Sequence, residues 1–191
     1  MLFHNVAIDA MAYELPPHRI TSAELEEQIA ETMARLGIEK GKIERPTGIR
    51  ERRVWDPGVT PSEVATMVGR KVIEKSGIDS NEIGCLISTS ITKDYVEPSV
   101  ASLIHGNLKL SSRCINFDIT NACLGFLDGI NTISLMIESE VIKYGLVVSE
   151  TVYAKAWKQR SSFCNHPMSP TKYSMITLLH LRSAMALWRC Y

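Results

Sequence analysis

Apolar strand-like runs alternate with helix-like segments along the middle of the chain, and this alternation restricts the fold more than any other feature. Residues 83–89, 114–119 and 144–149 are short apolar runs with the length of strands. Residues 98–110 and 122–138 lie between them and have the length and composition of helices. Such units form parallel sheets, and nearly continuous apolar strands are typical of a sheet covered on both faces. The pattern predicts an α/β fold, a sheet with helices on both faces.

Two capping boxes predict further helices in the first part of the chain. Thr21 is followed three residues later by Glu24, and Thr60 by Glu63, which is the pattern of a helix start. Glycines stand where each apolar periodicity ends, so we expect helices from Thr21 to about residue 36 and from Thr60 to about residue 76. The loose alternation of apolar and polar residues over 2–10 predicts a strand at the start of the chain.

The cysteines and the composition exclude several classes of protein. The five cysteines include no CxxC pair and are odd in number, so we predict no zinc site, no other metal and no disulfide framework. No run of about 18 apolar residues is present and the N-terminus lacks a signal-peptide pattern, which predicts a cytoplasmic protein without a membrane span. The cysteines are Cys85, Cys114, Cys123, Cys164 and Cys190.

Cys123 stands where a predicted strand ends and a predicted helix begins. Asn121 is a plausible N-cap, which would place Cys123 in the first helical turn. Free N–H groups and the positive end of the helix dipole would then favour a thiolate, and a thiolate is a nucleophile. The alternative is that Cys123 is a small buried residue at a strand–helix junction.

Four motifs give the chain a resemblance to a known family. Residues 47–53 read TGIRERR, residues 87–90 ISTS, residues 97–99 EPS, and residues 118–126 DITNACLGF. In this order and at these intervals, they resemble the thiolase-like condensing enzymes of the β-ketoacyl-acyl-carrier-protein synthase III type, over residues 1–153. The resemblance implies a thiolase-like layered fold, of which this chain holds the N-terminal half.

The resemblance also implies an activity. An acyltransferase of this kind moves an acyl group from a thioester of CoA or acyl carrier protein to the cysteine, here Cys123. A second thioester then supplies a carbanion that attacks the acyl group, with or without decarboxylation, in fatty acid or long-chain olefin biosynthesis. The family needs no cofactor and forms homodimers. Its oxyanion-stabilising groups lie in a second half that we do not find here, so we expect a truncated chain that acylates without full turnover.

Glu97 resembles a residue of the head-to-head condensing enzymes of long-chain olefin biosynthesis. In those enzymes a glutamate from one subunit enters the partner's site and removes the α-proton. A carboxylate in an apolar pocket is suited to this task. The alternative is that Glu97 caps the helix that Pro98 opens.

Three arginines are candidates for phosphate contacts. Arg50, Arg52 and Arg53 could hold the phosphates of CoA or of a carrier protein, because guanidinium groups bind phosphate well. A solvated loop face is the alternative. Three arginines in a chain of zero net charge do not predict nucleic-acid binding.

The end of the chain differs in composition from the rest. Residues 151–191 contain six Lys or Arg and no Asp, Glu or Gly. We therefore expect an incomplete thiolase-like domain over residues 1–153 and an atypical basic tail over 154–191, from a shifted reading frame or an abnormal splice. Two other function classes stay open: an inactive homologue that acts as a dimerisation or binding module, and attachment to a membrane surface through the apolar stripe at residues 175–188.

Overall fold

The structure, a computed structural model, describes residues 3–150 and 178–183 in two compact units. The larger unit consists, in its described part, of residues 3–14, 60–150 and 178–183. The described part of the smaller unit consists of residues 15–59. The predicted tail, 154–191, therefore lies outside the described residues except for 178–183, and its origin stays a prediction.

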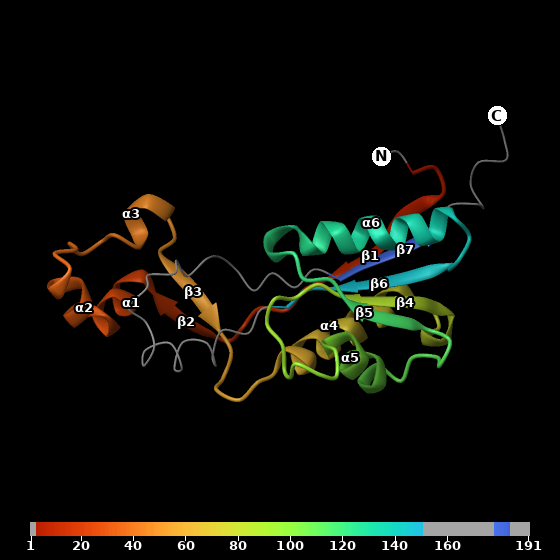
Figure 1. Ribbon diagram of the computed structural model, residues 1–191, viewed down its shortest axis with the longest axis horizontal. Helices are drawn as coiled ribbons and strands as arrows, with labels where there is room; N and C mark the ends of the chain where they lie inside the picture. Colours follow the sequence, from red (N-terminus) through yellow and green to blue (C-terminus); the bar gives the residue numbers. More distant parts are fainter. Residues whose placement is uncertain (1–2, 151–177, 184–191) are drawn as a thin grey trace. The chain divides into compact units, whose positions relative to one another are not determined.

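A five-stranded sheet forms the centre of the larger unit (Figure 1). The strands β4, β5 and β6 are parallel, as the alternation of strands and helices predicts. The strand β7 runs antiparallel to β6 on one side and to β1 on the other, and no strand is predicted there from the sequence. In spatial order the strands are β1 (Val6–Ala12), β7 (Leu178–Ser183), β6 (Tyr144–Val148), β4 (Ile83–Ser88) and β5 (Ile115–Asp118).

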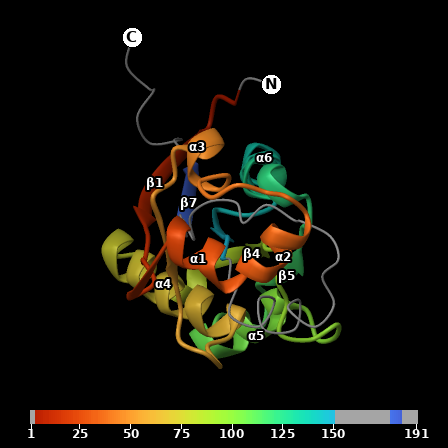
Figure 2. The ribbon, with the colours of Figure 1, turned by 90° about the vertical axis from the view of Figure 1, so that its left-hand side faces the viewer.

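Helices cover both faces of this sheet, which confirms the predicted layering. The helices α4 (Pro61–Ser76) and α5 (Val100–Leu108) lie on one face, and α6 (Gly125–Glu138) lies on the other (Figures 1 and 2). The apolar core beneath α6 consists of Cys85, Ile87, Ile133, Ile137 and Val147.

Local capping signals place the helix ends of the larger unit. Thr60 forms the predicted capping box with Glu63 at the start of α4, and Gly77 ends the helix in the left-handed region at φ 69°. The prediction for α5 is corrected at its start, because Ser99 caps it and the helix begins at Val100 rather than at Pro98.

Gly129 allows α6 to pack closely on the sheet. A Cβ atom at this position would lie 2.8 Å from a methyl group of Thr89 and 2.8 Å from a methyl group of Val147. Gly106 in α5 has no such neighbour within 4 Å. Gly129 and Gly106 therefore form a matched pair for a stability test, because both lie in helices but only Gly129 has close neighbours.

We expect Gly129→Ala to destabilise the protein by about 1–2 kcal/mol, because overpacking outweighs the better helix propensity of alanine. Gly106→Ala should instead stabilise it by up to about 1 kcal/mol. Urea unfolding of both variants measures the difference. Equal gains in stability would show that α6 does not approach the sheet as closely as described.

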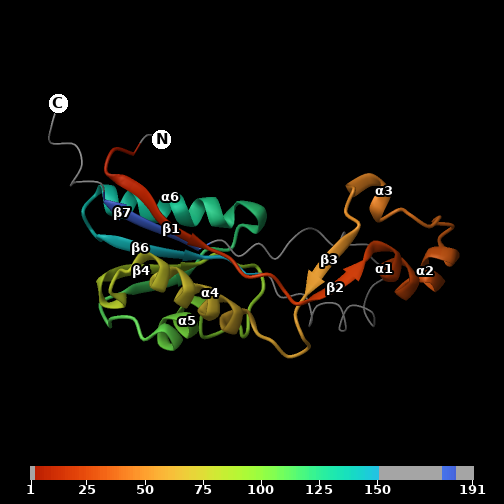
Figure 3. The same ribbon diagram turned by 180° about the vertical axis from the view of Figure 1, so that it is seen from behind.

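In its described residues, the smaller unit contains one antiparallel strand pair and short helices. The strands β2 (His18–Thr21) and β3 (Glu51–Val54) pair with each other (Figure 3). The predicted helix over residues 21–36 has its capping box at Thr21, but it is divided into two. Its helical φ/ψ pattern breaks at Ile29, which has φ −115° and ψ 16°. The three helices are α1 (Ser22–Gln28), α2 (Ala30–Arg35) and α3 (Glu44–Thr47).

A buried carboxylate fixes the loop between α2 and α3. Glu26 accepts hydrogen bonds from the backbone N–H groups of Gly41, at 2.6 Å, and of Ile43, at 2.8 Å. These bonds lower the pKa of Glu26. The strand pair and this loop depend on residues far apart in the chain, which explains why the local pattern does not predict them.

Candidate active site

The carboxyl ends of the three parallel strands lie side by side at one edge of the larger unit's sheet. The backbone N–H of Thr89, just after β4, donates to the carbonyl of Val148 at the end of β6, at 2.8 Å. The backbone N–H of Ile119, just after β5, donates to the carbonyl of Ser88 at 2.8 Å. Ligand sites in parallel α/β sheets lie at the carboxyl ends of the strands, so this edge is the place to expect functional residues.

Cys123 lies in a tight turn at this edge, between β5 and α6. The turn is a single 3-10 segment, Ala122–Leu124. The carbonyl of Asn121 accepts hydrogen bonds from the N–H groups of Leu124, at 2.9 Å, and of Gly125, at 3.1 Å. Ala122 has φ +43°, in the left-handed region that costs a non-glycine residue roughly 1–2 kcal/mol. The thiol is thus presented by a strained turn.

The structure corrects the predicted role of Asn121. Its side chain makes no capping bond, and α6 begins at Gly125 rather than at Ala122. Cys123 therefore precedes the α-helix instead of lying in its first turn. The reason is the left-handed conformation of Ala122, which turns the chain before the helix starts.

Cys123 differs from the other described cysteines in exposure. Cys85 and Cys114 are buried, whereas Cys123 is exposed. Burial raises the pKa of the Cys85 thiol to about 12 and that of the Cys114 thiol to about 11. The alternative that Cys123 is a buried packing residue is therefore wrong.

We expect iodoacetamide to alkylate Cys123 at least about tenfold faster than Cys85 or Cys114 in the folded protein, because burial keeps the other two thiols protonated and inaccessible. Peptide mapping by mass spectrometry measures the three rates. In urea all three thiols should react, which serves as the control. Equal rates in the folded protein would contradict the described burial.

Glu97 lies on an exposed part of the loop between β4 and α5. Its neighbours anchor the loop: the carboxylate of Asp94 accepts hydrogen bonds from the backbone N–H and the hydroxyl of Ser62, at 3.1 and 3.0 Å. Lys93 Nζ lies 3.1 Å from Asp118 Oδ2. Beyond these anchors, Val96 is 89% exposed.

The described contacts do not support the alternative that Glu97 caps α5. The Ser99 hydroxyl accepts a hydrogen bond from the N–H of Ser102 at 3.1 Å. The carboxylate of Asp118 accepts bonds from the N–H groups of Val100, at 3.2 Å, and of Ala101, at 2.9 Å. The end of α5 is therefore capped by groups other than Glu97.

Glu150, which follows β6, is a buried carboxyl group that no sequence motif indicates. It is 1% exposed, and neither carboxylate oxygen has a hydrogen-bond partner within the described part of the chain. Burial raises the pKa of Glu150 to about 8; the nearby Ser90 hydroxyl opposes this rise, and the charges of Asp118 and Asp94 add to it. Only its position directly after an apolar strand hints at this burial.

The three candidate arginines of the smaller unit do not converge on one point. Arg52 donates to the hydroxyl of Ser22 at 2.8 Å, and Arg53 donates to the carbonyl of Pro16 at 3.0 Å. Arg50 has a side chain that is 89% exposed, with its Nε 3.9 Å from a carboxylate oxygen of Glu44. Arg50 is therefore the arginine of the three with most access to a ligand.

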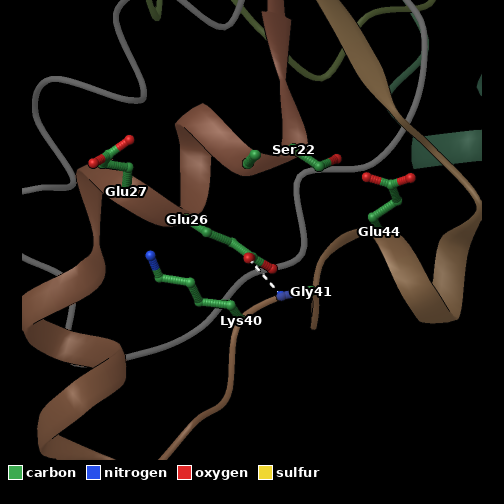
Figure 4. Close-up of a pocket in the computed structure, with 7 residues that line it drawn as sticks. Ser22, Glu26, Glu27, Lys40, Gly41 and Glu44 are labelled. Atoms are coloured by element: carbon green, nitrogen blue, oxygen red, sulfur yellow. Dashed lines mark hydrogen bonds between the residues drawn. The ribbon is translucent and has the colours of Figure 1, made fainter.

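A pocket in the smaller unit does not favour a phosphate ligand (Figure 4). It has a volume of about 240 Å³, and its charged lining residues are three glutamates and one lysine. Its lining residues are Ser22, Ala23, Glu26, Glu27, Lys40, Gly41 and Glu44.

The described residues contain no cluster of three His, Cys, Asp or Glu that could hold a metal ion. Among them there is also no helix long and apolar enough to cross a membrane.

A sheet layered between helices, with an exposed thiol in the turn between a parallel strand and a helix, fits a thiolase-like fold. Solved structures confirm this class. FabH, a 3-oxoacyl-(acyl carrier protein) synthase III of Xanthomonas oryzae, matches with a TM-score of 0.89 and 32% identity, over 98% of this chain and 59% of that one. OleA of Xanthomonas campestris with bound lauric acid and lauroyl-CoA matches with a TM-score of 0.88 and 32% identity, over 97% of this chain and 58% of that one.

Sequence comparisons lead to the same enzymes. The family of 3-oxoacyl-[acyl-carrier-protein (ACP)] synthase III matches residues 117–165 and so extends past residue 153. An acyl-CoA:acyl-CoA alkyltransferase of Xanthomonas campestris is 41% identical over 166 residues, which are 85% of this chain and 49% of that protein. A β-ketoacyl-[acyl-carrier-protein] synthase III of Clostridium beijerinckii is 32% identical over 83% of this chain and 47% of that protein.

The chain is similar to the thiolase-like condensing enzymes of the synthase III type, as the sequence motifs predict. It spans about half the length of the curated relatives that it matches.

Proposed function

We propose that the chain carries the acyl-accepting site of a condensing acyltransferase, with Cys123 as the nucleophile. The observation that carries the proposal is the exposed thiol in the strained turn at the carboxyl edge of the sheet. In this step the Cys123 thiolate attacks the carbonyl carbon of an acyl-CoA or acyl-carrier-protein thioester. A new carbon–sulfur bond forms, the old one breaks, and the CoA or carrier thiolate leaves with a proton.

Glu97 is the proposed base of the second step. A carboxylate removes the α-proton of a second acyl thioester, and the resulting carbanion attacks the acyl carbon on Cys123 and releases its thiolate. The support is that Glu97 is exposed, caps no helix of the described part of the chain, and follows two anchored residues, Lys93 and Asp94. We propose that it acts in the site of the partner in a homodimer. The relatives named acyl-CoA:acyl-CoA alkyltransferase support an acyl-CoA substrate.

The phosphates of the substrate are assigned to Arg50, the most exposed of the three candidate arginines. Arg52 and Arg53 contribute less to this contact, because their guanidinium groups donate to Ser22 and Pro16. The products of such a condensation belong to fatty acid or long-chain olefin biosynthesis, and acyl transfer to Cys123 is the first step in both.

Lauroyl-CoA tests the first step. After incubation, intact-mass analysis and peptide mapping should find one lauroyl group on Cys123 in the wild type and in Glu97→Gln, and none in Cys123→Ser. The Cys123→Ser variant should melt within a few degrees of the wild type, because the residue is exposed. A folded wild type that takes no acyl group would overturn the proposal.

Deuterium exchange tests the second step. In D₂O, the wild type should exchange the α-hydrogens of lauroyl-CoA, and Glu97→Gln should lose this exchange while it still accepts the acyl group. Exchange that Glu97→Gln retains would remove Glu97 as the base and leave Cys123 in place.

Binding to a longer homologue is the second candidate function. Large apolar side chains are exposed on the loop after β4, in the turn that contains Cys123 and on α6, and such surfaces mark protein interfaces. They are Ile91, Tyr95, Val96, Leu124, Leu127 and Leu135. A folded chain that forms dimers in sedimentation experiments but takes no acyl group would favour this function.

A further inference from the structure

The side chains of Asn121 and Asp128 join across the Cys123 turn. Asn121 Nδ2 donates a hydrogen bond to Asp128 Oδ2 with an N···O distance of 2.6 Å. Asn121 belongs to the loop after β5, and Asp128 to the first turn of α6, so the bond spans the segment that contains the thiol.

The main chain of Asn121 controls the shape of this turn. Its carbonyl is the acceptor for the N–H groups of both Leu124 and Gly125. A bond that fixes the Asn121 side chain therefore restricts the direction of this carbonyl as well. The restriction matters because Ala122, the next residue, has the unfavourable φ of +43° and would relax if it were not held.

Asp128 can anchor the turn because its helix, α6, is packed closely and cannot easily move. Its helix is pressed against the sheet, since a Cβ on Gly125 would lie 3.1 Å from the carbonyl oxygen of Thr89 and one on Gly129 would lie 2.8 Å from a Thr89 methyl group. The carboxylate also suits the positive end of the helix dipole. The dipole explains an acid in the first turn but does not explain its bond to Asn121.

We propose that Asn121 and Asp128 are positioning residues for the nucleophile: their amide–carboxylate bond holds the strained turn in the conformation that presents the Cys123 thiol to a thioester. The part of this inference that concerns acyl transfer rests on the proposed function. The part that concerns the conformation of the turn does not.

The experiment compares Asn121→Ala, Asp128→Ala, the double variant and Asp128→Asn with the wild type. Each alanine variant should slow acyl transfer from lauroyl-CoA to Cys123 about tenfold, as expected for the loss of one charge-assisted hydrogen bond at a partly exposed site. The double variant should be no slower than either single variant, because all three lack the same bond. Asp128→Asn should recover most of the rate, because its amide oxygen accepts the same bond.

Amide hydrogen exchange gives a second readout that does not need acyl transfer. The N–H groups of Leu124 and Gly125 should exchange several-fold faster in the alanine variants than in the wild type and in Asp128→Asn. Asn131→Ala, the same change at an exposed asparagine of α6, is the matched control and should alter neither readout.

Acyl transfer and amide exchange together distinguish a failure of the proposed function from a failure of the positioning role of Asn121 and Asp128. If the wild type takes no acyl group but exchange rises as expected, the proposed function fails and the positioning of the turn stands. If the alanine variants keep the wild-type acylation and exchange rates, or lose only thermal stability, the inference is overturned.

Discussion

Replacing Glu150 with glutamine should stabilise the protein, and the gain should grow as the pH rises from 5 to 8. The carboxyl group is 1% exposed, and burial raises its pKa from 4.5 to about 8. In the unfolded chain the group ionises near its ordinary value, whereas in the folded protein it keeps its proton to a much higher pH. Over the window between the two pKa values the folded state binds more protons, so the wild type loses stability as the pH rises.

Glutamine has the same shape and no charge, so it removes this penalty. We expect the advantage of Glu150→Gln to be small at pH 5 and to reach about 2–5 kcal/mol at pH 8. Urea unfolding at four pH values measures it. Glu97→Gln, the same change at an exposed side chain, should stay within about 0.5 kcal/mol of the wild type throughout. Parallel curves for the wild type and Glu150→Gln would mean that Glu150 is not buried as described.

Replacing Asp118 with alanine should destabilise the protein by about 3 kcal/mol. Its side chain is only 8% exposed and accepts hydrogen bonds from the N–H groups of Val100 and Ala101, so the change removes a buried cap from α5. It also leaves Lys93 without the carboxylate that lies 3.1 Å away. Asp118→Asn keeps an acceptor and should cost about half as much.

The effects of Asp118 and Glu150 should not be additive. The charge of Asp118 raises the pKa of Glu150, so Asp118→Ala relieves part of the penalty on Glu150 while it removes the cap. In the Glu150→Gln background this relief is absent, and Asp118→Ala should cost more than it does in the wild type at pH 8. Urea unfolding of the wild type, Asp118→Ala, Glu150→Gln and the double variant completes the double-mutant cycle. A cost below about 0.5 kcal/mol in both backgrounds would contradict the described cap.

The sequence predicts those features of this chain that depend on neighbouring residues. Thr21 and Thr60 cap helices through groups three residues away, and both capping boxes are present. The parallel strands are also predicted, because their apolar runs record burial on both faces. The strand–turn–helix location of Cys123 follows from the same local pattern.

Features that depend on distant residues are not predicted. Asp118 caps α5, whose first residues precede it by 17 and 18 positions. The burial of Glu150 depends on how the sheet edge is covered, which no local pattern records. The predicted N-cap at Asn121 is wrong because its side chain bonds instead to Asp128, seven residues further on.

The position of β7 determines when the sheet can be completed during synthesis on the ribosome. Among the described strands, β1 pairs only with β7, and β7 also separates β1 from β6. At the usual synthesis rates of 5–20 residues per second, Leu178 is added roughly 8–30 s after Ala12. Until then β1 lacks its pairing partner, and once Val148 has been added one side of β6 lacks its partner as well. Unpaired strand edges of this kind are templates for pairing with other chains.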